Sequence, residues 1–407
     1  MVDEYKSLLN EREESKNSVK YTSCYQRFSK PFVKLVILLS AIAMPIFFTV
    51  CYLRHEEWAK ILPVDDTWVV LSSDLNMYYL LHVPVVTMYW RNLGVKTLLL
   101  ITLKEGEEVD DDNRGLHTLL EFVEGYMGVK VIYLRNQTIP AGQFAQTVRS
   151  FAAGTEFAHT LDPDKTVFVT SDVDFFPSNL TLHIPKTHRG KEIMLYDVGC
   201  CGFLHWHGEL YPMYIMITVG MTVRKWRDVI GLPHDRPVDS KFIDTYVNKT
   251  FDNSINERNE FWRWFLDQRF FSLKMKHWKD EHEALFNKTV ETVDRKGQPR
   301  LERFQWPEKE EFKNMDVWKR YESAHIAPGI ILDPVWETNL PFYEKILRPE
   351  QIRKLTQLRK DVLKFTDVKQ IMANHYHPEK DDGYWQRTFH MKGMFNHSDH
   401  LNNAFKP

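Results

Sequence analysis

The hydrophobic and polar positions of this 407-residue chain change their period several times, and each change predicts an element. Apolar runs at 68–71, 97–101, 129–134 and 165–170 have the length of buried strands. Between the first two runs, apolar residues at 79–90 recur at helical spacing. Strands that alternate with helices are typical of an α/β domain, so we predict that fold with a largely parallel sheet.

Two further helices are expected. Phe144, Val148 and Phe151 share one helical face before the fourth strand, and a helical pattern runs from about Glu344 to Met372. Gly94 follows the first predicted helix in the position of a C-terminal cap. The end of the chain is polar and contains many His and Asn residues.

One apolar segment, residues 35–53, has neither the helical period nor the short length of a strand. It contains 19 residues without a charge, and as a helix it would be about 28 Å long, close to the ~30 Å hydrocarbon core of a bilayer. The alternative of a buried core helix fits less well, because a helix of a globular protein normally has a solvated face and this segment has none. A signal peptide has a shorter apolar stretch. We therefore predict one transmembrane helix.

Charges on either side of this segment predict its orientation. Four basic residues lie in 20–34 and only two in 54–60, so the N-terminus should face the cytosol. Acceptor triplets for N-glycosylation occur only after the span, as expected of a luminal domain. They begin at Asn136, Asn179, Asn248, Asn287 and Asn396.

These signals divide the chain into five parts. They are a cytoplasmic tail (1–34), a transmembrane signal-anchor (35–53), a short stem (54–66), a globular catalytic domain (67–340), and a C-terminal helix with a polar tail (341–407). The tail contains Glu4–Leu9 and Tyr25–Phe28, which look like dileucine and tyrosine-based sorting signals.

Composition narrows the classes of partner. The chain has 53 basic and 55 acidic side chains. Because these charges nearly cancel, the protein has no overall positive field that would attract nucleic acid. Cys200 and Cys201 are the only cysteines after the span. A disulfide between neighbours is strained, so the domain should fold by its apolar core and not on a disulfide framework.

Asp172 and Asp174 directly follow the fourth predicted strand, whereas the acidic runs at 110–112 and 162–164 lie in polar loops. Open α/β sheets bind ligands at the carboxyl ends of their strands. In an extended segment two side chains at this spacing project to the same side, and carboxylates suit Mn²⁺ or Mg²⁺. The alternatives are a solvated turn or a helix N-cap at Asp174.

These residues resemble the GT-A glycosyltransferases, which have one Rossmann-like domain and an Asp-x-Asp motif at a strand end. The resemblance covers about residues 67–330 and is carried by 69–74, 90–94, 170–174 and the pair Asp267-Gln268. It implies transfer of a sugar from a nucleotide-sugar, with a divalent metal at the reaction centre.

The resemblance also implies roles for single residues. Nucleotide or donor contacts are expected of Ser72, Ser73, Asp74, Arg149 and Asp172, metal ligation of Asp172, Asp174 and His325, and catalysis of Asp267. The identity of the third metal ligand is left open. The glycine and aromatic residues of 197–207 are typical of a sugar-binding loop.

Each of these roles has a structural alternative. Asp267 lies in an aromatic segment, and apolar surroundings raise the pKa of a carboxyl, which suits a base. It could instead pair with Arg263 or Arg269. Arg149 could be a surface residue of its helix, and His325 a surface or core residue.

The expected protein is a type II Golgi membrane glycosyltransferase that cycles through endosomes. Its donor would be a UDP-sugar with Mn²⁺ or Mg²⁺, its acceptor a glycan or glycoprotein, and a homodimer is left open. A phosphatase of the haloacid dehalogenase type is disfavoured because Phe176 stands where a small residue is needed. A non-catalytic type II lectin or receptor with the same fold is the remaining alternative.

Overall fold

The computed structural model describes residues 66–375, apart from 110–112, 137, 295–298, 304–310, 312–317 and 319, together with Met44. The chain divides into two units, residues 1–60 and 61–407. The predicted span lies outside the described residues except for Met44. Within the described part, no helix has both the length and the apolar character needed to cross a bilayer.

A seven-stranded sheet forms the centre of the second unit, in the order β10-β6-β9-β4-β1-β2-β3. Strand β9 runs antiparallel to β4 and β6, and the other neighbouring pairs are parallel. The strands are β1 (Asp66–Asp74), β2 (Lys96–Lys104), β3 (Lys130–Asn136), β4 (Thr166–Thr170), β6 (Ile193–Tyr196), β9 (Val219–Thr222) and β10 (Val290–Val293). The predicted α/β fold with a largely parallel sheet is confirmed.

The composition of the strands explains why both faces of the sheet are covered. Between its two exposed terminal lysines, β2 has seven consecutive buried residues, as expected of a parallel strand with helices on either side. In the parallel register Val70 is opposite both Leu98 and Thr170. Strands β1 and β4 therefore end at the same edge, which carries Asp74 and Asp172.

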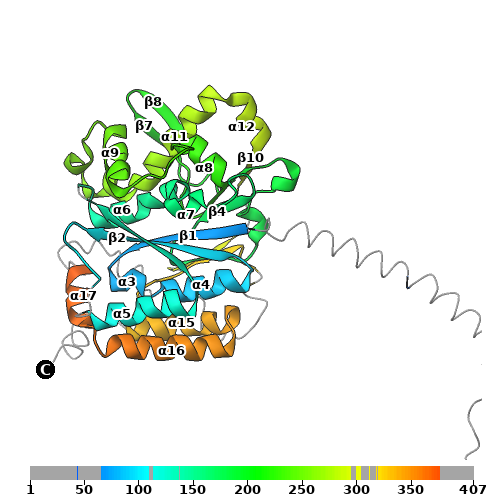
Figure 1. Ribbon diagram of the computed structural model, residues 1–407. Helices are drawn as coiled ribbons and strands as arrows, with labels where there is room; N and C mark the ends of the chain where they lie inside the picture. The colour runs from blue at the N-terminus through cyan, green and yellow to red at the C-terminus, as the bar shows by residue number, and fades with distance from the viewer. Residues whose placement is uncertain are drawn as a thin grey trace, which may run out of the picture. The chain divides into compact units, whose positions relative to one another are not determined.

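Helices pack on both faces of the sheet (Figure 1). One layer contributes to the core around Val69, Trp90 and Phe342, and the other to the core around Val70, Trp226 and Phe270. The first layer consists of α3 (Met77–Leu80), α4 (Val83–Asn92), α5 (Arg114–Glu121), α15 (Asp333–Ile346), α16 (Pro349–Leu363) and α17 (Val368–His375). The second consists of α6 (Ala141–Val148), α7 (Glu156–His159), α8 (Val223–Ile230), α9 (Ser240–Thr250), α10 (Glu260–Trp264), α11 (Leu266–Glu281) and α12 (Glu283–Thr289).

The described residues also form short helical turns. They are the π-helical η1 (Phe122–Tyr126) and the 3₁₀ turns η2 (Arg149–Gly154), η3 (Leu180–Leu182), η4 (Thr187–Arg189) and η5 (Ile255–Glu257).

Prolines divide two helices that the sequence predicted as continuous. The first becomes α3 and α4, because Pro84 lies in the opening turn of α4, where a missing N–H costs nothing. Gly94 ends this segment in the left-handed region (φ +81°), as predicted. The helix expected over 344–372 is three helices, and Pro349 opens the second of them.

A second, three-stranded sheet joins distant segments to the acidic pair. It contains β5 (Phe175–Pro177), β11 (Arg300–Glu302) and β12 (Ser323–His325), in the order β11-β12-β5. In its register His325 is opposite both Phe175 and Glu302. A separate hairpin consists of β7 (Phe203–Trp206) and β8 (Glu209–Pro212).

Candidate metal and donor site

Asp172 and Asp174 occupy a turn between β4 and β5. The N–H of Phe175 donates to the carbonyl of Asp172 at 3.3 Å. The segment therefore turns, and the prediction that it is extended is wrong. The helix N-cap alternative is wrong, because Asp174 precedes a strand. Asp174 is 4% exposed and so does not belong to a solvated turn, whereas the side chain of Asp172 is 31% exposed.

His325 joins this pair through the pairing of β5 with β12. Ile326 donates its N–H to the carbonyl of Asp174 at 3.0 Å, which places the imidazole beside the carboxylates. One ligand atom from each of Asp172, Asp174 and His325 lies within 4.8 Å of the other two. Two carboxylates and an imidazole are a donor set that suits Mn²⁺, so the residues present fit the expected metal.

Arg303 contacts two members of this cluster. Its Nη2 atom donates to Asp174 Oδ2 at 2.9 Å and to His325 Nε2 at 2.6 Å. Because arginine has only donors, Nε2 must be the acceptor, and the His325 proton then lies on Nδ1, which is 3.5 Å from Glu302 Oε2. His325 is neutral whenever this contact is made, although its carboxylate neighbours raise its pKa against the effects of burial and Arg303.

Asp174 is ionised in this arrangement. Burial alone would raise the pKa of its carboxyl, but the attraction of His325 in its protonated form and of the Arg303 guanidinium outweighs burial and lowers that pKa. The site thus holds a buried carboxylate, which is the form that coordinates a cation.

Arg149 connects Asp172 to Asp267. Its Nη1 donates to Asp172 Oδ1, its Nη2 to Asp267 Oδ2 at 2.9 Å, and its Nε to the carbonyl of Gln146 at 3.1 Å. The side chain is 4% exposed, so Arg149 is not a surface residue of its helix. Its contact with the donor remains a prediction.

Asp267 begins α11 and is buried beside the cluster. Burial raises the pKa of its carboxyl to about 6, and the nearby Asp172 adds to this effect while Arg149 opposes it. The ion pair that Asp267 makes is with Arg149, and not with Arg263 or Arg269 as the alternative supposed. A carboxylate whose pKa lies near neutral pH has the property expected of a general base.

His82 contacts the backbone of the acidic turn. Its Nδ1 lies 2.5 Å from the carbonyl of Val173 and its Nε2 lies 2.7 Å from the hydroxyl of Tyr343. A carbonyl only accepts, so Nδ1 carries the proton, and Nε2 accepts from Tyr343. Burial lowers the pKa of His82 to about 4, which keeps the ring neutral.

The predicted nucleotide-contacting residues Ser72, Ser73 and Asp74 end β1, next to the end of β4. Ser73 is buried and donates to the carbonyl of Asp74 at 2.8 Å, and Asp74 Oδ1 accepts from the N–H of Asn76 at 3.2 Å. Burial raises the pKa of Asp74. These residues lie at the edge of the sheet that carries Asp172 and Asp174, and their contact with the nucleotide stays a prediction.

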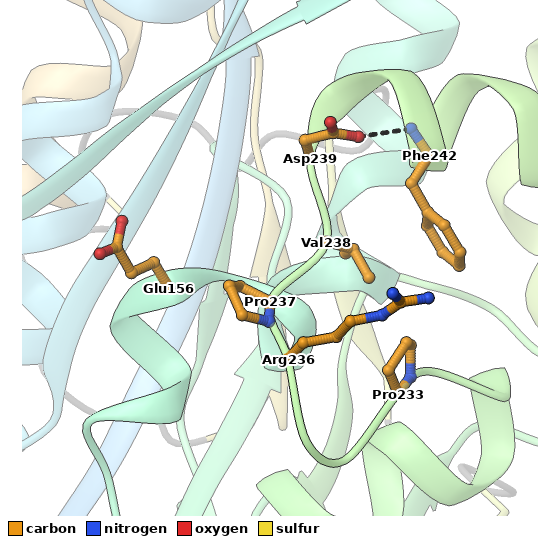
Figure 2. Close-up of a pocket in the computed structure, with 7 residues that line it drawn as sticks. All are labelled: Glu156, Pro233, Arg236, Pro237, Val238, Asp239 and Phe242. Atoms are coloured by element: carbon orange, nitrogen blue, oxygen red, sulfur yellow. Dashed lines mark hydrogen bonds between the residues drawn. The ribbon is translucent and has the colours of Figure 1, made fainter.

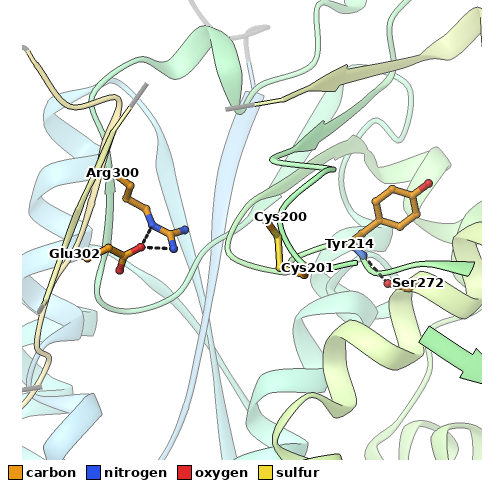
Figure 3. The surroundings of a disulfide bond; sticks show 6 residues. All are labelled: Cys200, Cys201, Tyr214, Ser272, Arg300 and Glu302. Atoms are coloured by element: carbon orange, nitrogen blue, oxygen red, sulfur yellow. Dashed lines mark hydrogen bonds and ion pairs between the residues drawn. A yellow bond between two sulfur atoms is a disulfide. The ribbon is translucent and has the colours of Figure 1, made fainter. Parts of the chain in front are cut away.

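Cys200 and Cys201 form a disulfide in the exposed loop between β6 and β7 (Figure 3). Strand β6 is parallel to β4, since β9 is antiparallel to both, so this loop leaves the sheet at the edge of the acidic pair. The segment after β8 is held on α11, where Tyr214 N–H donates to Ser272 Oγ at 2.8 Å. The predicted sugar-binding segment therefore starts at the same edge of the sheet as the cluster.

A pocket of about 420 Å³ lies elsewhere, between the start of α7 and the start of α9 (Figure 2). It is lined by Glu156, Pro233, Arg236, Pro237, Val238, Asp239 and Phe242. None of these is a predicted site residue, and α7 precedes β4 at the end opposite to Asp172. We assign no role in the site to this pocket.

Four residues of the site were not singled out from the sequence. They are His82, Glu302, Arg303 and Tyr343. Arg300-Leu301-Glu302-Arg303 has no motif and only a three-residue strand, so nothing local marks it. Its contacts arise from the pairing of β11 with β12, which only the fold reveals.

No protein-family model and no curated protein matches this sequence. Among solved structures, the galactosyltransferase LgtC with donor and acceptor sugar analogues is 10% identical, covering 76% of this chain and 100% of its own, with a TM-score of 0.32. The apo glycosyltransferase GlyE of Streptococcus pneumoniae TIGR4 is 14% identical, covering 71% of this chain and 64% of its own, with a TM-score of 0.32. At these values neither likeness identifies the family or the activity of this chain.

Proposed function

We propose that this chain is a metal-dependent glycosyltransferase that moves a sugar from a nucleotide-sugar, with UDP as the nucleotide, to a hydroxyl of a glycan or glycoprotein. The observation that carries the proposal is the cluster of Asp172, Asp174 and His325 at the carboxyl edge of the sheet. Arg149 connects this cluster to a buried carboxylate, Asp267. A metal ligand set and a candidate base thus lie side by side.

Separate groups of residues would bind the metal, position the nucleotide and accept the proton. Asp172, Asp174 and His325 would hold Mn²⁺ or Mg²⁺, which when bound neutralises the diphosphate that leaves the sugar. The other groups act on the organic substrates: Ser72, Ser73 and Asp74 would position the nucleotide at the end of β1. Asp267 would accept the proton of the acceptor hydroxyl, and Arg149 would hold its carboxylate in place.

We further propose that the chain is anchored by the apolar segment 35–53 with its folded unit in the lumen of the Golgi, and that it cycles through endosomes. The support is the flanking charge, the position of the glycosylation triplets and the sorting-type patterns. The Cys200–Cys201 disulfide adds support, because disulfides persist in oxidising compartments.

The test is turnover of donor by the full-length chain purified in mild detergent. A panel of UDP- and GDP-sugars is incubated with Mn²⁺, and released nucleotide diphosphate is measured with and without glycan acceptors. We expect one donor to be consumed, and we expect Asp174→Ala to lower that rate by about 100-fold or more, since it removes a buried metal ligand.

Asp164→Ala is the matched control, because Asp164 belongs to another Asp-x-Asp triplet and pairs with Arg224 at the surface. It should leave the rate unchanged. If no nucleoside diphosphate binds in the presence of Mn²⁺, the chain is no transferase of this class. The alternative hypothesis, a non-catalytic lectin or receptor with the same fold, would then be favoured.

A further inference from the structure

Arg303 is hydrogen-bonded to the atoms that a metal ion would use. It donates to Asp174 Oδ2 at 2.9 Å and to His325 Nε2 at 2.6 Å. The second oxygen of Asp174, Oδ1, is 3.4 Å from the same nitrogen of His325. Two of the three candidate ligands are therefore engaged with a single guanidinium.

A guanidinium and a divalent cation cannot use these atoms together. The neutral imidazole has one acceptor nitrogen, and its single lone pair either accepts from Arg303 or coordinates a metal. Metal bonds to N and O ligands are about 2.0–2.2 Å long, so the ion would also lie in close contact with a positive charge. Metal binding at His325 thus requires that Arg303 leave.

Arg149, the other arginine of the site, need not move. It is 4% exposed and is bonded to Asp267 and to the carbonyl of Gln146 as well as to Asp172. It uses only one carboxylate oxygen of Asp172, which leaves Oδ2 for a cation. Arg303 follows the last residue of β11, and its side chain is 14% exposed, so it is the more accessible of the two arginines.

We propose that Arg303 is the counter-cation of the metal-free site, that the metal ion displaces it, and that the released guanidinium then binds the diphosphate of the donor. The last step rests on the proposed function. Guanidinium groups bind phosphate oxygens through paired hydrogen bonds, and a diphosphate bound at the metal would lie within reach of this side chain. Arg303 would thereby couple metal binding to nucleotide binding.

The first test is Mn²⁺ affinity in the absence of nucleotide, measured by calorimetry on the full-length chain. Arg303→Gln removes the competing cation, and we expect it to bind Mn²⁺ about tenfold more tightly than the wild type, the worth of one charge-assisted hydrogen bond. Arg303→Lys keeps a cation and should stay near the wild-type value. Arg224→Gln, which removes a surface arginine paired with Asp164, should not differ from the wild type.

The second test uses UDP as the probe in saturating Mn²⁺. Arg303→Gln should bind UDP about tenfold more weakly, so that the factor by which Mn²⁺ and UDP promote each other's binding falls. If the variant is less stable, the rise in melting temperature on adding Mn²⁺ provides a further readout, and it should be larger than in the wild type.

Equal or weaker Mn²⁺ affinity in Arg303→Gln, or an equal rise in melting temperature, would overturn the proposal. If the wild type also turns over a nucleotide-sugar with Mn²⁺, only the role of Arg303 fails. If neither protein binds Mn²⁺ at all, both the role of Arg303 and the proposed function fail.

Discussion

His82 and Tyr343 are joined by a hydrogen bond of 2.7 Å across 261 positions of sequence. The Tyr343 hydroxyl donates to His82 Nε2, while Nδ1 of the same ring donates to the carbonyl of Val173. Asn339 adds a bond to the Tyr343 oxygen at 3.1 Å. Helix α15 therefore connects through His82 to the backbone between Asp172 and Asp174, and the position of the acidic pair depends on it.

Removing the Tyr343 hydroxyl should loosen this connection. Tyr343→Phe leaves the buried Nε2 of His82 without its donor, and we expect a loss of about 1–2 kcal/mol in the free energy of unfolding, measured with urea. Tyr133→Phe is the matched control, because its hydroxyl bonds Glu124 on an exposed side chain. Its effect should stay within about 0.5 kcal/mol, and equal losses in both variants would contradict the role of Tyr343.

Acid should destabilise the protein through His82. The pKa of His82 is lowered from 6.5 to about 4 in the folded state, so the unfolded chain takes up the proton first. The stability is full above pH 6.5 and is lost as pH falls toward 4, by roughly 3 kcal/mol at most.

The measurement is the free energy of unfolding at several pH values between 4 and 7. His82→Asn keeps a donor for Val173 but does not titrate, so its unfolding free energy should fall less steeply with acid. A slope equal to that of the wild type would show that other groups cause the loss.

The sequence predicted the features that depend on residues close together in the chain. The strands β1 to β4 are marked by runs of buried residues, and the position of Asp172 and Asp174 follows from the strand that precedes them. The split of the first helix could have been seen at Pro84, which fixes a helix start.

The remainder of the site depends on pairing over long distances. Arg303 contacts Asp174 across 129 positions, through two strands of only three residues each. Such strands are too short to show a periodic pattern. Which strands they pair with depends on contacts between distant segments. Sequence reasoning therefore reached the acidic pair, His325 and Arg149, but not Arg303, which pairs with Asp174.

Gly329 should be essential for the placement of His325. A Cβ at this position would lie 2.2 Å from Tyr78 Cε2, in the buried contact between α3 and the segment after β12. We expect Gly329→Ala to lower the free energy of unfolding by about 1–3 kcal/mol, the usual cost of overpacking, and to weaken Mn²⁺ binding.

Gly142→Ala is the matched control for this change. Gly142 lies in the first turn of α6, and an added Cβ meets nothing within 4 Å. Alanine is the better helix former, so this variant should be as stable as the wild type or slightly more so. If Gly329→Ala also leaves stability and Mn²⁺ affinity unchanged, Tyr78 can give way and the glycine is not required.

The pH dependence of transfer should report on Asp267. Its pKa is raised by burial to about 6, so below that pH the carboxyl is protonated and cannot accept the acceptor's proton. We expect kcat/KM to fall with a slope of one as pH drops through about 6. Asp267→Asn should lose about 100-fold or more in rate, whereas Asp280→Asn, which alters a surface ion pair of α11 with Lys276, should keep the wild-type profile.

Protonation of Asp267 does not itself destabilise the folded protein. The folded-state pKa lies above the ordinary value of 3.8, so protonation of this carboxyl favours the folded state. Its contribution to stability is full below pH 3.8 and is lost as pH rises through about 6. Activity and the Asp267 part of stability therefore change in opposite directions with pH. An Asp267→Asn protein that keeps the acid limb at the same pH would assign the limb to another group, and Asp267 would no longer be the candidate base.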